Sequence, residues 1–344
     1  MFTKTTLTAL LAAALCFNTM AQSLDDPGNY MTAVSNTQNE MNQRYMQYMS
    51  TSAHGASARK QEKVRQQVLE SITNTRYKIT DLPLYKGDNG LRKASLDYVQ
   101  LCYNVFNEDY NKIVNLEEIA EQSFDEMQAV MLLHEKTDEK LDEANKKMDA
   151  AYDAFATKNN VKVTEGKSEL GDKLNTAGKV NKYLNNVYLV FFKCNWQDGQ
   201  LTKANDTKKI NDIEQARNAL ITYADEGLRT LDTTKAFGGD NSLINTCRMI
   251  LKKYKRLGEE IVPKMNDYLL KQEAFTKMKK SFDAKGNRTK EEVDEFNKMV
   301  KEINAAVNSS NQAVNQSNAE RKQINDSWNE AYKQFQNNHM PYYK

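Results

Sequence analysis

The stretch Gly87-Asp88-Asn89-Gly90-Leu91 returns 152 positions later as Gly239-Asp240-Asn241-Ser242-Leu243. Each copy lies between two long segments whose apolar residues recur at the three- and four-residue spacing of a helix. Glycine permits a tight turn, and an aspartate beside it can accept hydrogen bonds from the N–H groups that open the next helix. The motif therefore predicts a structural turn and helix cap, formed by Gly87, Asp88 and Asn89 and again by Gly239, Asp240 and Asn241.

The constant offset predicts two copies of one helical unit. Apolar positions match in phase: Val64 with Ala216, Val68 with Leu220, Ile72 with Ala224, Ile79 with Leu231 and Leu91 with Leu243. The chain has 4 prolines and 13 glycines among 344 residues, and 27% of its residues are charged, which favours long amphipathic helices over a sheet. We predict an all-α fold of two tandem antiparallel helical bundles that arose by internal duplication, at residues 22–160 and 167–344, with a long C-terminal helix.

The apolar spacing also predicts where the helices lie. In the first bundle we expect helices over about 29–52, 64–82, 91–116 and 130–155, with a break near Ser123. A polar connection at 159–166 separates the bundles. In the second we expect helices over about 180–194, 210–231, 243–261 and 289–335, with Pro263 kinking or ending the third.

The final helix carries a coiled-coil-like seam from Val300 to Phe335. Its middle is weak, because Ser310, Ser317 and Arg321 occupy positions that large apolar groups would fill. We therefore expect this part to pack loosely or to overhang the bundle. An alternative is that the seam joins two copies of the chain into an elongated spacer.

The first 21 residues have the pattern of an export signal. Lys4 precedes an apolar run at 7–17, and Thr19-Met20-Ala21 resembles a cleavage site before Gln22. The run is too short to span a bilayer, and no later stretch is more apolar. Acylation at Cys16 fits poorly because bulky Leu15 precedes it. We expect an exported protein, periplasmic, on the outer surface or secreted, without a transmembrane segment.

Charge gives little sign of nucleic-acid binding. Lys and Arg number 48 and Asp and Glu number 46, and the two signs are interspersed. No broad basic face is expected, so nucleic acid is not a predicted partner.

Several short stretches carry a resemblance to a known family. Asn107-Glu108-Asp109-Tyr110 and the segment 116–123, Leu-Glu-Glu-Ile-Ala-Glu-Gln-Ser, follow the first Gly-Asp-Asn motif. Together they resemble a family of uncharacterised exported helical surface proteins of Bacteroidota and spirochaetes, mainly over the first unit. The resemblance implies an exported bacterial protein and carries no activity or catalytic residue.

Three cysteines would remain after removal of the signal: Cys102, Cys194 and Cys247. An up-down-up helix order would place Cys194 and Cys247 toward opposite ends of the second bundle, beyond the reach of a disulfide. We predict free, mostly buried thiols. The alternative is that Cys194 is exposed near a helix end and bridges two molecules.

Metal and catalytic patterns are sparse. His134 and Asp138 stand four residues apart, but two ligands do not make a site, and a solvated helix face explains them. Asp88 and Asn89 could supply part of a calcium loop, yet the remaining ligands of such a loop are missing. No nucleophile, phosphate-binding or zinc-hydrolase motif occurs. We predict a non-enzyme with no cofactor and no catalytic or metal site, and keep a metal-binding protein as an alternative.

Tyrosine and methionine gather on the first helix, at Met41, Tyr45, Met46, Tyr48 and Met49. They surround more of that helix than one core stripe requires, and both residue types serve binding surfaces. The competing interpretation is a helix buried on several sides. We predict a binding or cell-envelope-associated module whose partner is a protein or a cell-surface glycan, with these five residues as the contact surface.

Overall fold

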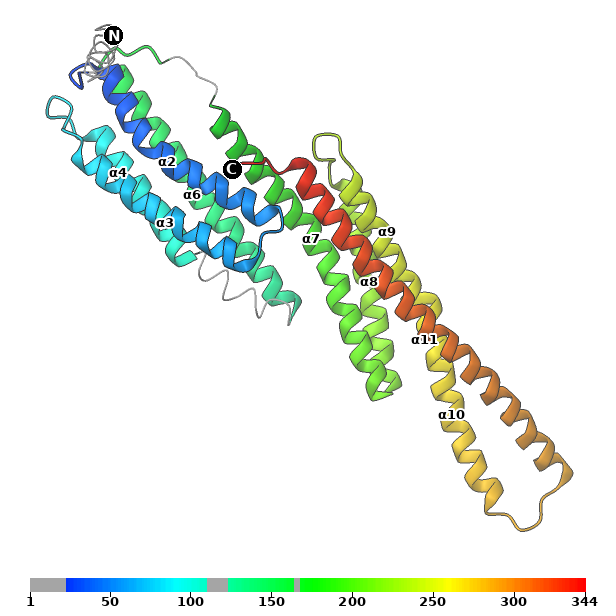
Figure 1. The fold of residues 1–344 in the computed structure, drawn as a ribbon. Coiled ribbons are helices and arrows are strands. Elements are labelled where there is room, and N and C mark those ends of the chain that lie inside the picture. The colour runs from blue at the N-terminus through cyan, green and yellow to red at the C-terminus, as the bar shows by residue number, and fades with distance from the viewer. Residues whose placement is uncertain (1–22, 110–122, 164–167) are drawn as a thin grey trace, which may run out of the picture. The chain divides into compact units, whose positions relative to one another are not determined.

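The computed structural model describes residues 23–109, 123–163 and 168–344, apart from the side chains of Ala58, Asp109, His134 and Asp138 (Figure 1). Every regular element in these residues is helical, which confirms the all-α prediction. None of the helices described is both long and apolar enough to cross a membrane. The predicted signal at 1–21 lies outside the described residues.

The first unit contains α2 (Pro27–Ala53), α3 (Ala58–Asp81), α4 (Gly90–Asn104) and most of α6 (Phe124–Lys158). A π-helical turn, η1 (Val105–Asp109), continues α4. The end of α3 falls just before Leu82-Pro83, where the residue ahead of proline leaves helical geometry.

The second unit contains α7 (Glu169–Thr207) from residue 176 onward, α8 (Ile210–Thr233) and α9 (Ser242–Arg256). The π-helical turn η2 (Leu257–Ile261) then leads into α10 (Val262–Asp283), which has Pro263 in its first turn, and α11 (Lys290–His339) completes the unit. Residues 168–175 and 341–344 belong with the first unit and 123–131 with the second, so the division at 175/176 lies beyond the predicted connection at 159–166.

Both Gly-Asp-Asn motifs form the same turn. Lys86 and Gly87 have φ of 47° and 82°, and Gly238 and Gly239 have φ of 56° and 91°. Two successive positive φ angles are what a type I′ turn requires. A β-bridge closes each turn, between Tyr85 and Asp88 and between Phe237 and Asp240.

The aspartate of each motif then opens the following helix. The Gly90 N–H donates to Asp88 Oδ1 at 2.8 Å, and the Ser242 N–H donates to Asp240 Oδ1 at 2.7 Å. Asn89 and Asn241 hold the N-cap positions, but their side chains make no capping hydrogen bond. The capping oxygens therefore come from the aspartates.

The offset of 152 extends to the helix boundaries. Shifting the first and last residues of α3, α4 and η1 by 152 gives those of α8, α9 and η2. Arg65 donates to the Phe106 carbonyl of η1 at 3.2 Å, and Arg217 donates to the Gly258 carbonyl of η2 at 3.4 Å. The two units therefore repeat the same helix boundaries and the same arginine contact at an offset of 152.

An aromatic cluster lies beside the turn in each unit. In the first unit the Tyr30 ring is 5.2 Å from Tyr85 and 5.6 Å from Phe155. In the second, Tyr183 is 5.3 Å from Phe237 and 5.2 Å from Phe335. Most members of these clusters are buried, so the rings anchor the turn to the helices around it.

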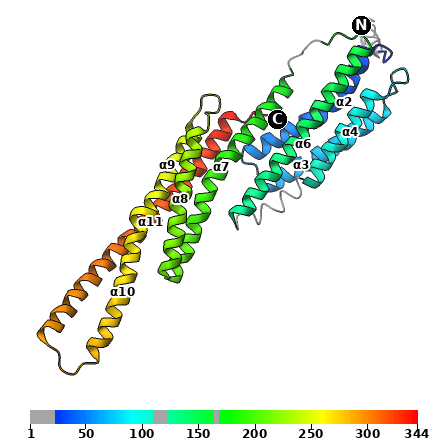
Figure 2. The same ribbon diagram turned by 180° about the vertical axis from the view of Figure 1, so that it is seen from behind.

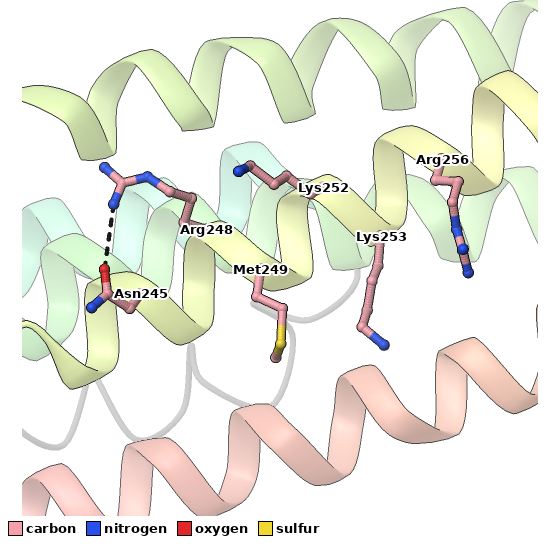
Figure 3. Close-up of a pocket in the computed structure, with 6 residues that line it drawn as sticks. All are labelled: Asn245, Arg248, Met249, Lys252, Lys253 and Arg256. Atoms are coloured by element: carbon pink, nitrogen blue, oxygen red, sulfur yellow. Dashed lines mark hydrogen bonds between the residues drawn. The ribbon is translucent and has the colours of Figure 1, made fainter.

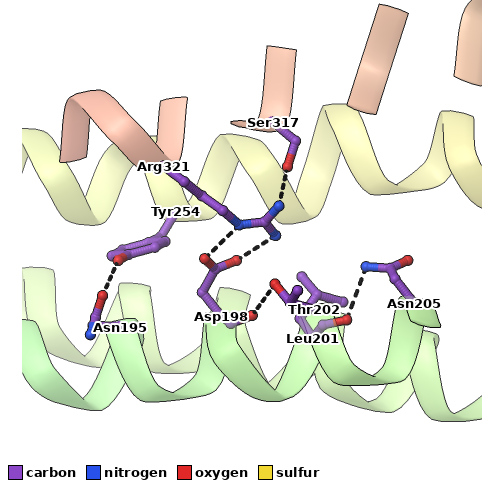
Figure 4. A network of polar contacts seen from close by, with 8 residues as sticks. All are labelled: Asn195, Asp198, Leu201, Thr202, Asn205, Tyr254, Ser317 and Arg321. Atoms are coloured by element: carbon purple, nitrogen blue, oxygen red, sulfur yellow. Dashed lines mark hydrogen bonds and ion pairs between the residues drawn. The ribbon is translucent and has the colours of Figure 1, made fainter. Parts of the chain in front are cut away.

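The middle of the α11 seam is better packed than predicted. Ser310 and Ser317 are buried, and Arg321 makes two hydrogen-bonded contacts of 2.7 and 2.8 Å with the buried carboxylate of Asp198 on α7 (Figure 4). Ser317 Oγ accepts from the same guanidinium at 2.5 Å. The expectation of loose packing there was wrong, because polar contacts replace apolar ones. The part of α11 without buried residues lies before Ala306 instead.

All three thiols are free and buried, as predicted. Burial raises the pKa of Cys102 and of Cys194 to about 12. Burial also raises the pKa of Cys247, and the Cys194 thiol raises it further. Tyr254, two turns after Cys247 on α9, donates to Asn195, the residue after Cys194 on α7, at 3.0 Å, so the two cysteines lie on facing stretches of these helices. The expectation of opposite ends was wrong because α7 continues to Thr207, well past Cys194. Burial of Cys194 also removes the proposed intermolecular bridge.

Candidate binding groove on α9

The predicted contact surface on the first helix does not lie open. Met41, Met46 and Met49 are buried, and Tyr45 and Tyr48 are half-buried. The rings of Tyr45 and Tyr48 lie 5.1 and 6.3 Å from Phe106, at the edge of the first unit's core. The competing interpretation, a helix buried on several sides, fits the exposure of these five residues better.

His134 and Asp138, the pair considered for the metal-binding alternative, lie outside the side chains that the structure describes. Among the described residues, no group of three or more His, Cys, Asp or Glu side chains is placed to hold a metal ion.

An open groove of about 460 Å³ runs along α9 (Figure 3). The side chains that line it come from one stripe of this helix, at spacings of three and four: Asn245, Arg248, Met249, Lys252, Lys253 and Arg256. Residues at those spacings share one helix face. Four cationic side chains therefore stand together along about 12 Å of helix, at about 1.5 Å of rise per residue.

The opposite face of α9 explains why this stripe stays at the surface. That face is buried in the second unit's core and consists of Leu243, Ile244, Cys247, Ile250, Leu251 and Tyr254. Burial of the apolar face fixes the rotation of the helix and directs the basic stripe to solvent. Within α9 there is no acidic residue to neutralise it.

Neighbouring helices hold three of the four cations in position. Arg248 Nη2 lies 2.8 Å from Asp232 of α8. Lys253 donates to Gln323 and Arg256 pairs with Glu320, and both partners belong to α11, toward which these two side chains point (Figure 3). Gln323 carries no charge, so the Lys253 charge is oriented without being neutralised.

Lys252 is the fourth cation, and its side chain is exposed. It makes no ion pair with any residue that the structure describes. With two carboxylates, Asp232 and Glu320, against four cations, the groove keeps a net positive charge. Met249, 41% exposed, adds a flexible apolar contact between the charges.

Such an arrangement can hold an anion at the surface. Lysine offers rotatable donors on a long stem, and arginine offers a planar set that suits carboxylate or phosphate oxygens. The groove contains no paired acid and base and no activated nucleophile among its lining residues. Its chemistry is therefore that of binding.

The corresponding stripe of the first unit is different. At the offset of 152, Arg248 matches Leu96, Lys252 matches Gln100, Lys253 matches Leu101 and Arg256 matches Asn104. Leu96 and Leu101 pack against the first unit's core. The basic groove is thus a property of the second unit and is not needed to form the shared turn and helices.

Sequence reasoning missed this groove because it weighed the charges of the whole chain, which nearly balance. The local signal was present: α9 has five basic residues and no acidic one, and Arg248, Lys252 and Arg256 are spaced by four. What the sequence did not reveal is that α8 and α11 contact the edges of this stripe and leave Lys252 exposed between them.

No protein-family model, curated protein or solved structure matches this chain.

Proposed function

We propose that this chain is an exported, non-enzymatic helical-bundle protein that acts as a binding module of the cell envelope, and that the α9 groove holds an anionic partner. The observation that carries the proposal is the net positive, solvent-open stripe on α9. Export rests on the signal-like first 21 residues.

The shape of the stripe favours an extended partner over a compact one. A linear polyanion can run along α9 and meet Lys252 and Lys253, which no carboxylate among the described residues neutralises, as well as the paired Arg248 and Arg256, whereas a small ion would reach only one or two of the four. The lining residues include no Trp or Tyr, and Met249 is the one apolar side chain, so they lack the aromatic pocket that often anchors a protein partner. An acidic cell-surface polysaccharide is therefore the proposed partner class.

The test is a titration of the mature protein, residues 22–344, with uronic-acid oligosaccharides and with neutral oligosaccharides of equal length. We expect binding of the acidic series alone, weakening as salt is added, because salt screens exposed charges. Lys252→Gln combined with Lys253→Gln should weaken that binding about tenfold, since each exposed charge contact contributes up to about 1 kcal/mol.

The matched control is Lys60→Gln with Lys63→Gln on α3, which removes the same charge from two exposed lysines of the first unit. It should leave the affinity unchanged. Equal binding of the neutral series, or equal losses in both variants, would contradict the proposal. Binding of polyglutamate without uronic acids would assign the groove to an acidic protein segment instead.

A further inference from the structure

The second unit carries a two-helix arm that extends beyond the ends of α7 and α8 (Figures 1 and 2). Asn266 of α10 is buried and donates from Nδ2 to Glu214 of α8 at 2.5 Å. The next buried residue along the chain is Ala306 of α11. Between them, over residues 267–305, every side chain is exposed or half-buried. We call this segment the α10–α11 arm.

Several side-chain contacts order the tip of the arm, where α10 ends and α11 begins. Thr289 caps α11 in a reciprocal capping box with Glu292. The guanidinium of Arg288 lies 4.5 Å over the ring of Phe282 and donates to the Phe282 carbonyl at 3.0 Å. Phe282 in turn stacks on Phe296 at 4.2 Å. These contacts fix α10 against α11 far from the rest of the unit.

Two helices alone leave the apolar seam of the arm incompletely covered. A core-facing helix buries a stripe about 100° wide, and in the arm each stripe meets one neighbour where a bundle would supply two. The half-buried members are Tyr268, Leu269, Phe275, Met278, Phe282, Phe296, Met299, Val300 and Ile303. Leu270 is 54% exposed and Val293 is 37% exposed. Partly exposed apolar side chains along both helices of the arm offer a surface that another chain could cover.

The charges of the arm indicate which chain that is. α10 has five lysines and three carboxylates, whereas residues 290–305 of α11 have three lysines and five carboxylates. One helix of the arm is therefore net positive and the other net negative. When two arms pack about a twofold axis, each α10 can lie between its own α11 and the α11 of its partner, so the signs alternate around four helices.

We infer that a second copy of this chain covers the seam, with the two α10–α11 arms forming one antiparallel four-helix bundle. This interaction is separate from the groove on α9 and does not depend on it. It also differs from dimerisation along Val300 to Phe335, because α11 from Ala306 onward already buries its seam within its own unit.

Sedimentation equilibrium of the mature protein, residues 22–344, tests the inference. The unaltered protein should be a dimer, and Val293→Asp, three residues before Phe296 on the seam of α11, should raise the dissociation constant at least about tenfold by placing a charge there. Leu270→Asp is the matched control, because helical spacing puts Leu270 on another face of α10 from Tyr268 and Phe275. Circular dichroism should show unchanged helix content, because both side chains are already exposed. A monomer at every concentration, or equal effects of the two substitutions, would overturn the inference.

Charge reversal gives a second, independent measurement. Lys277→Glu with Lys280→Glu on α10 should weaken the dimer, because α10 then repels the acidic helix of the partner. A separately purified chain with Asp294→Lys and Glu295→Lys should also dimerise weakly, yet the two variants should pair with each other when mixed. Repair within one chain cannot explain pairing between two chains, so failure to form the mixed dimer would count against pairing of the arms.

Discussion

Helices α4 and α9 occupy the same place in their units and differ in what they show to solvent. Both follow a Gly-Asp-Asn turn and both run into a π-helical turn. Their buried faces match in position, with Leu91 and Leu243, and with Val99 and Leu251. Their other faces differ. On α4, Leu96 and Leu101 of this face pack against the core, whereas on α9 the corresponding face forms the basic groove. The fold therefore constrains the buried face and leaves the other free to take up a function.

The interiors around the π-helical turns differ as well. In the first unit Phe106 is buried and its ring meets Tyr45. The equivalent position in the second unit is Gly258, where an added Cβ would lie 2.7 Å from Ile221 Cγ1. The second unit instead buries an ion pair, Asp198 with Arg321 (Figure 4). Around the π-helical turn, the first unit therefore packs the aromatic rings of Phe106 and Tyr45. The second unit has a close approach of helices at Gly258 and an ion pair between Asp198 and Arg321.

Removing one member of that ion pair should have the largest effect. Asp198→Ala leaves the half-buried guanidinium of Arg321 without its partner, which should lower the free energy of unfolding of the second unit by about 3 kcal/mol. Both tryptophans, Trp196 and Trp328, lie in this unit, so their fluorescence during chemical denaturation reports on it alone.

The control replaces both members with apolar residues, Asp198→Leu with Arg321→Met. It should recover most of the lost stability, because a well-packed apolar pair avoids the cost of burying charge. If Asp198→Ala and the double variant unfold alike, the ion pair is not what distinguishes the second unit's interior.

Gly258→Ala should have a smaller effect, about 1–3 kcal/mol of destabilisation, because the added methyl group overpacks the approach to Ile221. Tryptophan fluorescence again measures it. Gly199→Ala on α7 is the matched control: its Cβ would meet nothing within 4 Å, and alanine is the better helix former by about 1 kcal/mol. If Gly258→Ala and Gly199→Ala both destabilise the protein, close packing at Gly258 does not explain the loss of stability.

Apolar spacing and proline predicted the helices well, because each signal acts within a few residues. The end of α3 before Leu82-Pro83 and the two turns with Asp88 and Asp240 are local features of this kind. The pairing of Asp198 with Arg321 was not predictable, since 123 residues separate them.

The candidate site was harder to predict for a related reason. Spacing on one helix does not say how many neighbours cover it. Met46, a predicted contact residue, is fully buried, whereas Lys252, which the sequence pattern did not single out, lines the groove. The exposure of a side chain depends on which other helices pack against it, and the sequence of a single helix does not give that information.

The smallest predicted effect concerns the aspartates of the two turns, Asp88 and Asp240, and the stability that each contributes. The hydrogen bond from Lys158 lowers the pKa of Asp88, with further help from the Gly90 N–H, and the hydrogen bond from His339 lowers the pKa of Asp240. A carboxyl whose pKa is lower in the folded state stabilises the fold above its unfolded pKa, and this contribution is lost as the pH falls through the folded pKa. The stabilisation should therefore be present above about pH 4 and disappear below it.

Asp88→Asn and Asp240→Asn should each cost less than about 1 kcal/mol at neutral pH, because both pairs are partly solvated. The Asp240 substitution should cost more, since His339 also packs on Phe335 at 4.4 Å, whereas Lys158 is 67% exposed. Hydrogen exchange at the amides of Gly90 and Ser242, followed from neutral to acidic pH, measures each turn separately. Each substitution should flatten the acid dependence at its own turn. Flattening at both turns from one substitution would mean that the two units do not respond independently.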